Sequence, residues 1–149
     1  MDFPLLDICD DELGETLLRK HFHPRGLRCP GCQASVTQAR VFGHTRRSQV
    51  IQYRCRKCQT VYTVYTGTLF ANKQLRPAQV VLLLRGVCKG ESTASLSREL
   101  ELAYDTVHHL RQHLHDHARR LQSESPLPDA ITETDEMFQN AGERRPKTQ

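Results

Sequence analysis

The chain has 149 residues, a mean hydropathy of -0.58, a formal net charge of +4 and no tryptophan, which favours small modules over one large hydrophobic core. The longest apolar run, residues 80–84, is too short for a membrane span, which needs about 18 residues. Residues 1–15 hold six acids and no bases, whereas residues 16–90 hold fourteen Lys or Arg and no acids, so we expect a basic surface that contacts nucleic acid.

The first predicted element is a short amphipathic helix over residues 10–22. Its leucines and Phe22 recur at helical spacing, and acidic residues occupy its first turn, which suits the helix dipole. The sequence His23-Pro24-Arg25-Gly26 then ends it. No basic residue precedes Arg19, so the chain lacks the positive region of a signal peptide, and we expect a cytoplasmic protein.

Two cysteine pairs follow, each of the form C-x2-C, with 22 residues between them. Two such pairs supply the four thiolates of a closed tetrahedral zinc site, which leaves no coordination position for a catalytic water. We therefore predict one structural Zn²⁺, and its predicted ligands are Cys29, Cys32, Cys55 and Cys58. A disulfide or a redox pair is the alternative, which a reducing compartment and the lack of a βαβ pattern disfavour. Cys9 and Cys88 remain as predicted small core residues.

Three short strands accompany the cysteine pairs, at residues 39–43, 49–54 and 60–66, where β-branched and aromatic residues gather. Three strands with two cysteine knuckles are typical of a zinc ribbon, which we place at residues 24–72. A ribbon of this size has little apolar mass, so zinc binding should supply much of its folding free energy.

Three helices are predicted next. Pro77 fits the first turn of a helix that runs to about Val87, Ser92 can cap a second helix over residues 93–100, and a third spans residues 104–121. A short helix, a tight turn and a longer helix are typical of a helix-turn-helix, predicted here as a three-helix domain over residues 73–122, although any small three-helix bundle has the same periodicity. The predicted packing stripe of the third helix is Val107, Leu110, Leu114, Ala118 and Leu121.

The residues outside that stripe are candidates for contact with a DNA major groove. Together with basic residues of the ribbon, the predicted DNA contacts are Arg46, Arg47, Arg54, Arg56, Lys57, Thr106, His108, His109, Arg111 and Gln112. His109, His113 and His117 also follow one another at a spacing of four, which admits a second metal site. We favour a solvated or phosphate-facing helix surface, because Asp116 points elsewhere on the helix and no other ligand completes the site.

Residues 123–149 are predicted to be a linker, SESPLP, followed by a lone strand over residues 130–138 that carries Asp135. A single strand is not a stable domain. From the residues alone, an exposed acidic turn is the favoured interpretation of Asp135 and Glu136. The predicted fold is therefore α+β, with a leading helix in residues 1–23, the ribbon, the helix-turn-helix domain and this strand remnant.

The order of these parts resembles the bacterial insertion-sequence transposases that carry an N-terminal zinc ribbon ahead of an RNase H-like, DDE-type catalytic domain. The resemblance covers about residues 13–142 and matches only the front portion of such an enzyme. Its most specific pieces are the cysteine spacing, TGTLF at residues 66–70 and TDE at residues 134–136. The chain departs from the pattern at several positions. No Trp follows Pro77. Gln33, Gln59 and Glu101 stand where Gly is common, and a residue other than Gly predicts local backbone strain there.

The resemblance implies that Asp135 is the first catalytic carboxylate and that a full-length relative binds Mg²⁺ with further carboxylates from later strands. Those strands are absent, so we expect a truncated transposase that binds the inverted repeats of double-stranded DNA and does not cut it alone. The resemblance also implies that the protein associates with the bacterial nucleoid. Two protein partners stay open, a second copy and a complementing catalytic polypeptide; a membrane partner is not expected. The alternatives are a stand-alone zinc-ribbon and helix-turn-helix transcriptional regulator and a protein-interaction module.

Overall fold

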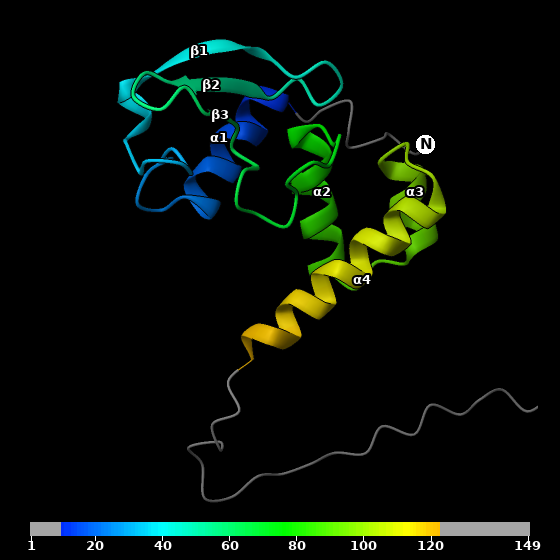
Figure 1. Ribbon diagram of the computed structural model, residues 1–149. Coiled ribbons are helices and arrows are strands. Elements are labelled where there is room, and N and C mark those ends of the chain that lie inside the picture. Colours follow the sequence, from blue (N-terminus) through cyan, green and yellow to red (C-terminus); the bar gives the residue numbers. More distant parts are fainter. Residues whose placement is uncertain (1–9, 123–149) are drawn as a thin grey trace, which may run out of the picture.

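The computed structural model describes residues 10–122 and has an α+β fold. Four helices accompany a three-stranded antiparallel sheet of order β1-β2-β3 (Figure 1). Helix α1 lies on one side of the sheet, and the C-terminal half of α4 extends away from the body. The predicted remnant strand and Asp135 lie outside the described residues. Within residues 10–122, no helix is long and apolar enough to cross a membrane.

The sheet consists of β1 (Ala39–His44), β2 (Ile51–Cys55) and β3 (Val61–Tyr62). A bulge interrupts the β1–β2 register between Val41 and Gly43. Strand β3 is shorter than the predicted 60–66, because two threonines redirect the chain after Tyr62. The Thr66 hydroxyl accepts from the Thr63 N–H at 3.0 Å, and the Thr63 hydroxyl accepts from the Tyr65 N–H at 3.1 Å. Such local bonds compete with a strand ladder and form a turn instead.

The predicted helices are confirmed, with ends within two residues of the expected positions. They are α1 (Asp11–Phe22), α2 (Pro77–Cys88), α3 (Thr93–Glu99) and α4 (Tyr104–Leu121), and a short 3-10 turn, η2 (Val36–Gln38), precedes β1. The side chain of Ser92 accepts from the Ser95 N–H at 3.1 Å, so it caps α3 as predicted.

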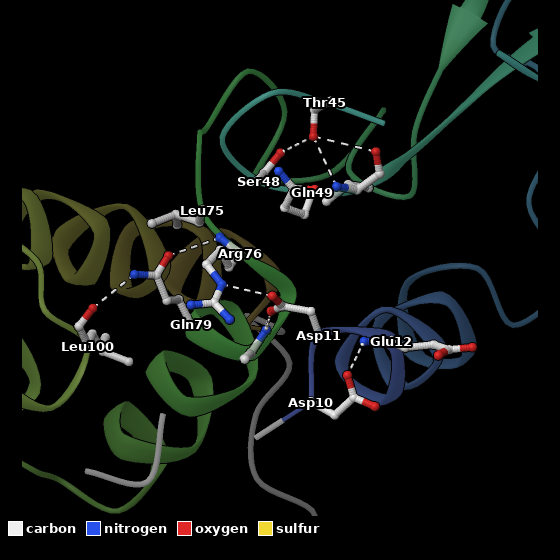
Figure 2. A network of polar contacts seen from close by, with 12 residues as sticks. Asp10, Asp11, Glu12, Thr45, Ser48, Gln49, Leu75, Arg76, Gln79 and Leu100 are labelled. Carbon is white, nitrogen blue, oxygen red and sulfur yellow. Dashed lines mark hydrogen bonds and ion pairs between the residues drawn. The ribbon is translucent and has the colours of Figure 1, made fainter. Parts of the chain in front are cut away.

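Helices α1 and α2 cross at Gly14. A Cβ at this position would lie 3.0 Å from the backbone carbonyl carbon of Pro77, so any other residue would require this tight approach to widen. Beside the crossing, the Asp11 carboxylate accepts from the Ala78 N–H at 3.1 Å and from the Arg76 side chain at 2.8 Å (Figure 2). Asp11 therefore caps α2 from the neighbouring helix.

Figure 2 also shows how the buried Gln79 joins α2 to the end of α3. Its amide oxygen accepts from the Arg76 N–H, and its amide nitrogen donates to the Leu100 carbonyl, both at 2.9 Å. Two residues further on, the Leu102 carbonyl accepts from the Ser97 hydroxyl at 2.7 Å. These bonds hold the turn between α3 and α4, and so determine where α4 begins.

The main hydrophobic core joins the four helices to the segments that flank the sheet. It contains Leu18 of α1, Val50 before β2, Phe70 of the segment between β3 and α2, Leu83 of α2 and Val107 of α4. A second, smaller cluster fills the cysteine end of the sheet, with Leu27, Cys29, Tyr53, Cys55 and Tyr62. Two of its five buried members are metal-site cysteines, so this cluster depends on what those cysteines bind.

Two packing predictions were wrong. Cys88 is exposed at the end of α2 instead of lying in the core. In α4, Val107 and Leu110 are buried and Leu114 is half-buried, but Ala118 is exposed and Leu121 is 72% exposed. The reason is geometric, because the last turns of α4 project beyond α2 and α3 (Figure 1).

Candidate metal centre and nucleic-acid interface

Four cysteines converge at one end of the sheet. Cys29 Sγ lies 3.3 Å from Cys58 Sγ, and Cys32 Sγ lies 3.5 Å from Cys55 Sγ, so each contact joins the two pairs. All four sulfurs lie within 4.8 Å of one another. A disulfide would need a sulfur separation of about 2.05 Å, whereas a tetrahedral metal with bonds of about 2.3 Å places its sulfurs about 3.8 Å apart. The four thiols therefore fit a shared metal ion better than two disulfides.

The two cysteine loops have the same backbone geometry. In the first, the Gln33 N–H donates to the Cys29 carbonyl, and the Cys29 N–H donates to the Ala34 carbonyl, both at 2.9 Å. In the second, the Gln59 N–H donates to the Cys55 carbonyl at 3.1 Å, and the Cys55 N–H donates to the Thr60 carbonyl at 3.0 Å. Matched loops of this kind point their sulfurs toward a common centre.

The residue after each loop has a left-handed backbone. Gln33 has φ 60° and Gln59 has φ 62°, and Glu101 in the α3–α4 turn has φ 53°. These are the three positions where the sequence predicted strain because glycine is common there. A non-glycine residue in this conformation costs about 1–2 kcal/mol, so the strain is present at all three.

The surroundings of the four thiols shift their pKa values in different directions. Hydrogen bonds from the hydroxyl and backbone of Thr60 lower the pKa of Cys58 to about 6. The Ala34 backbone lowers the pKa of Cys32, but the neighbouring cysteines and desolvation outweigh it and raise that pKa to about 12. Four thiolates this close repel one another, and a bound cation removes that conflict.

The cysteines form the only group of three or more His, Cys, Asp or Glu side chains within metal-binding distance among residues 10–122. His109, His113 and His117 of α4 do not form such a group. The part of the chain that the structure describes thus has one candidate metal centre.

Two hollows adjoin the β1–β2 turn, and the second of them reaches the start of α4. The first hollow has a volume of about 570 Å³. Its lining includes Arg46 of the turn, Gln52 of β2 and Val61 of β3, together with side chains from residues 63–74. The second, of about 460 Å³, includes Thr106 and His109 of α4. No acidic residue lines either hollow.

Arg47, Lys73 and Gln74 line both hollows and so connect them. Arg47 Nη1 donates to Gln74 Oε1 at 2.7 Å, which ties the β1–β2 turn to the segment before α2. Arg46 and Arg47 of the predicted ribbon and the start of the predicted base-reading helix, α4, therefore border one continuous surface. The predicted DNA contacts that it brings together are Arg46, Arg47, Thr106 and His109.

The other predicted DNA contacts lie elsewhere. Arg54 is on the outer face of the sheet, and Arg56 and Lys57 are exposed within the second cysteine loop. On α4, the His108 ring stacks on Tyr104 with a centroid separation of 6.1 Å, and Gln112 is exposed. Arg111 is half-buried and donates to the Glu91 carbonyl, so its side chain also holds α4 to the start of α3.

Sequence reasoning missed Lys73 and Gln74, which join the two hollows. Lys73 lies within the acid-free stretch and was available as a signal, but Gln74 has no distinguishing pattern. It also missed Phe42, which is 50% exposed on the sheet.

No family model matches this sequence, and comparison with curated proteins and with solved structures gives no match.

Proposed function

We propose that this chain binds double-stranded DNA in a sequence-specific manner, and that it corresponds to the end-recognising part of a zinc-ribbon insertion-sequence transposase. The observation that carries the proposal is the position of Arg47, which borders both acid-free hollows and links the β1–β2 turn to the surface beside Thr106 and His109. A duplex seated there would meet arginines and the start of a helix at once.

Zinc is the metal that we assign to the four cysteines. A closed set of four thiolates is the usual structural zinc site, and tetrahedral sulfur sites otherwise hold iron. Zinc with four thiolates is formally an anion of charge -2, which nearby cations offset. Arg56 and Lys57 lie between Cys55 and Cys58, so they serve the metal centre as well as any phosphate.

The α3–α4 pair supports a helix-turn-helix. Seven residues of α3 and eighteen of α4 are joined by a turn in which Glu101 has φ 53°. In such motifs the second helix places its N-terminal residues in the major groove. Thr106 and His109 occupy that end of α4 and are exposed. We propose that they contact base edges while Arg46 and Arg47 contact phosphates.

We assign no strand cleavage to this part of the chain. Transposition by two-metal chemistry needs several carboxylates around a pair of Mg²⁺ ions. Among residues 10–122, no cluster of Asp, Glu and His side chains is close enough to hold a metal. Asp135 remains the proposed first carboxylate of a catalytic domain in full-length relatives.

Selection from a random duplex pool at physiological salt tests this proposal. We expect a defined sequence to emerge, bound at least about a thousandfold more tightly than random duplex. With about six phosphates neutralised, the logarithm of the association constant should fall with the logarithm of salt concentration at a slope near -5. A flat salt dependence with no selected sequence would leave a protein-interaction module as the better account.

A further inference from the structure

The outer face of the sheet carries an exposed aromatic ring among arginines. Phe42 is 50% exposed and occupies the β1 bulge between Val41 and Gly43. The Arg54 guanidinium carbon lies 3.9 Å from the centroid of its ring. Arg40 is the register partner of Arg54 and stands on the same face. Bulges re-aim side chains, so the ring is presented outward from an otherwise regular strand pair.

This face is separate from the core of the sheet. Tyr53 and Tyr62 point into the small cluster with the cysteines, and side chains alternate along a strand. Arg54 and its register partner Val61 therefore face outward. The Arg54 Nε atom is buried and has no hydrogen-bond partner among the described residues. The Arg54 guanidinium instead packs against the Phe42 ring.

The face also continues into the proposed DNA surface. Val61 and Gln52 belong to the sheet and line the first hollow together with Arg47 and Lys73. The residues that line this hollow include no acid, and neither do Arg40, Phe42, Arg54 and Val61 on the outer face.

From this arrangement, and building on the proposed function, we infer that Phe42 and Arg54 form a stacking site for an unpaired base next to the bound duplex. The Arg54 guanidinium lies over the ring, and Phe42 is nevertheless 50% exposed, which leaves ring surface for a base. A base inside an intact duplex is already stacked on both sides, so an unpaired nucleotide is the chemistry that fits. Such stacking is tolerant of sequence, because every base has a π-face.

Binding of three DNAs tests the inference: a blunt duplex, the same duplex with a short single-stranded extension, and the single strand alone. We expect the extension to tighten binding about 5- to 150-fold, the range for stacking of one base. A 2-aminopurine placed in the extension should lose fluorescence on binding, because stacking quenches it.

Three variants make the result specific. Phe42→Leu keeps an apolar side chain and should abolish the preference for the extension, whereas Phe42→Trp should retain it. Val41→Ala is the matched control, since Val41 is also exposed on β1 but pairs with Tyr53 on the other face. Circular dichroism verifies that each variant is folded.

Equal affinity for blunt and extended duplexes would overturn the inference. So would an equal loss of affinity for both duplexes in Phe42→Leu, because the ring would then contact paired DNA. If the protein binds the single strand through Phe42 but no duplex, the proposed function fails and the stacking site stands. If it binds none of the three DNAs, both fail.

Discussion

Arg47 of the β1–β2 turn donates to Gln74 at 2.7 Å, although 27 residues separate them in sequence. The bond places a ribbon arginine against the second hollow, where Thr106 and His109 of α4 also lie. Because neither hollow has an acidic lining residue, the arrangement favours a polyanion that spans both.

Replacing Arg47 should weaken duplex binding and change its salt dependence. We expect Arg47→Ala to make the log-log salt slope shallower by about 0.9, the contribution of one phosphate contact. Gln74→Ala should lower affinity less and leave the slope unchanged, because Gln74 only positions the arginine. Lys20→Ala, an exposed base on α1 outside both hollows, is the control. Identical slopes for Arg47→Ala and Lys20→Ala would place the DNA elsewhere.

Gln33 and Gln59, two of the three glutamines with a left-handed backbone, are sites where glycine should stabilise the protein. Left-handed backbone costs a non-glycine residue about 1–2 kcal/mol, and the extra entropy of glycine takes back about 0.5–1 kcal/mol. We expect Gln33→Gly and Gln59→Gly each to raise the free energy of unfolding by about 0.5–1 kcal/mol in denaturant titrations. Gln52→Gly, within β2, should lower it. Destabilisation by all three would show that the glutamine side chains matter more than the backbone.

Gly14 offers a test in which two effects have opposite signs. Helix propensity alone predicts that Gly14→Ala stabilises by about 1 kcal/mol. The new Cβ would instead meet the Pro77 backbone at 3.0 Å, and overpacking of this kind costs about 1–3 kcal/mol. We expect net destabilisation by thermal unfolding, whereas Thr16→Ala on the exposed side of α1 should be neutral or stabilising. A more stable Gly14→Ala would mean that α1 and α2 do not meet at this glycine.

Tyr65 should make stability fall at alkaline pH. Burial, followed by the charges of Glu15 and Asp11, raises the pKa of this phenol above its usual value. The folded state therefore holds a proton that the unfolded chain releases above about pH 10, so the free energy of unfolding decreases as pH rises past that value. Tyr65→Phe should flatten this alkaline decline, and at neutral pH it should cost about 1 kcal/mol for the lost bond to the Leu75 carbonyl. An unchanged alkaline decline would assign it to other groups.

Local signals explain why the helices were predictable. Pro77 and Ser92 mark helix starts that depend only on neighbouring residues, and the cysteine spacing alone predicted four converging thiols. Strand β3 was overestimated because Thr63 and Thr66 bond their own backbone, which β propensity does not register. The exposure of Leu121 and the bonds of Arg47 and Arg111 depend on how distant elements pack, so no local pattern contains them.

The central claim is that a zinc site organises a DNA-binding surface, and metal content measured together with duplex binding tests it most directly. We expect one zinc per chain, with no iron, and loss of sequence-specific duplex binding after chelation that zinc restores. Cys55→Ser should lose the metal and the binding, while Cys88→Ser should keep both, because Cys88 is exposed and outside the cluster. Two results would contradict the account: purified protein that contains no zinc, or duplex binding that is unchanged after chelation removes the zinc.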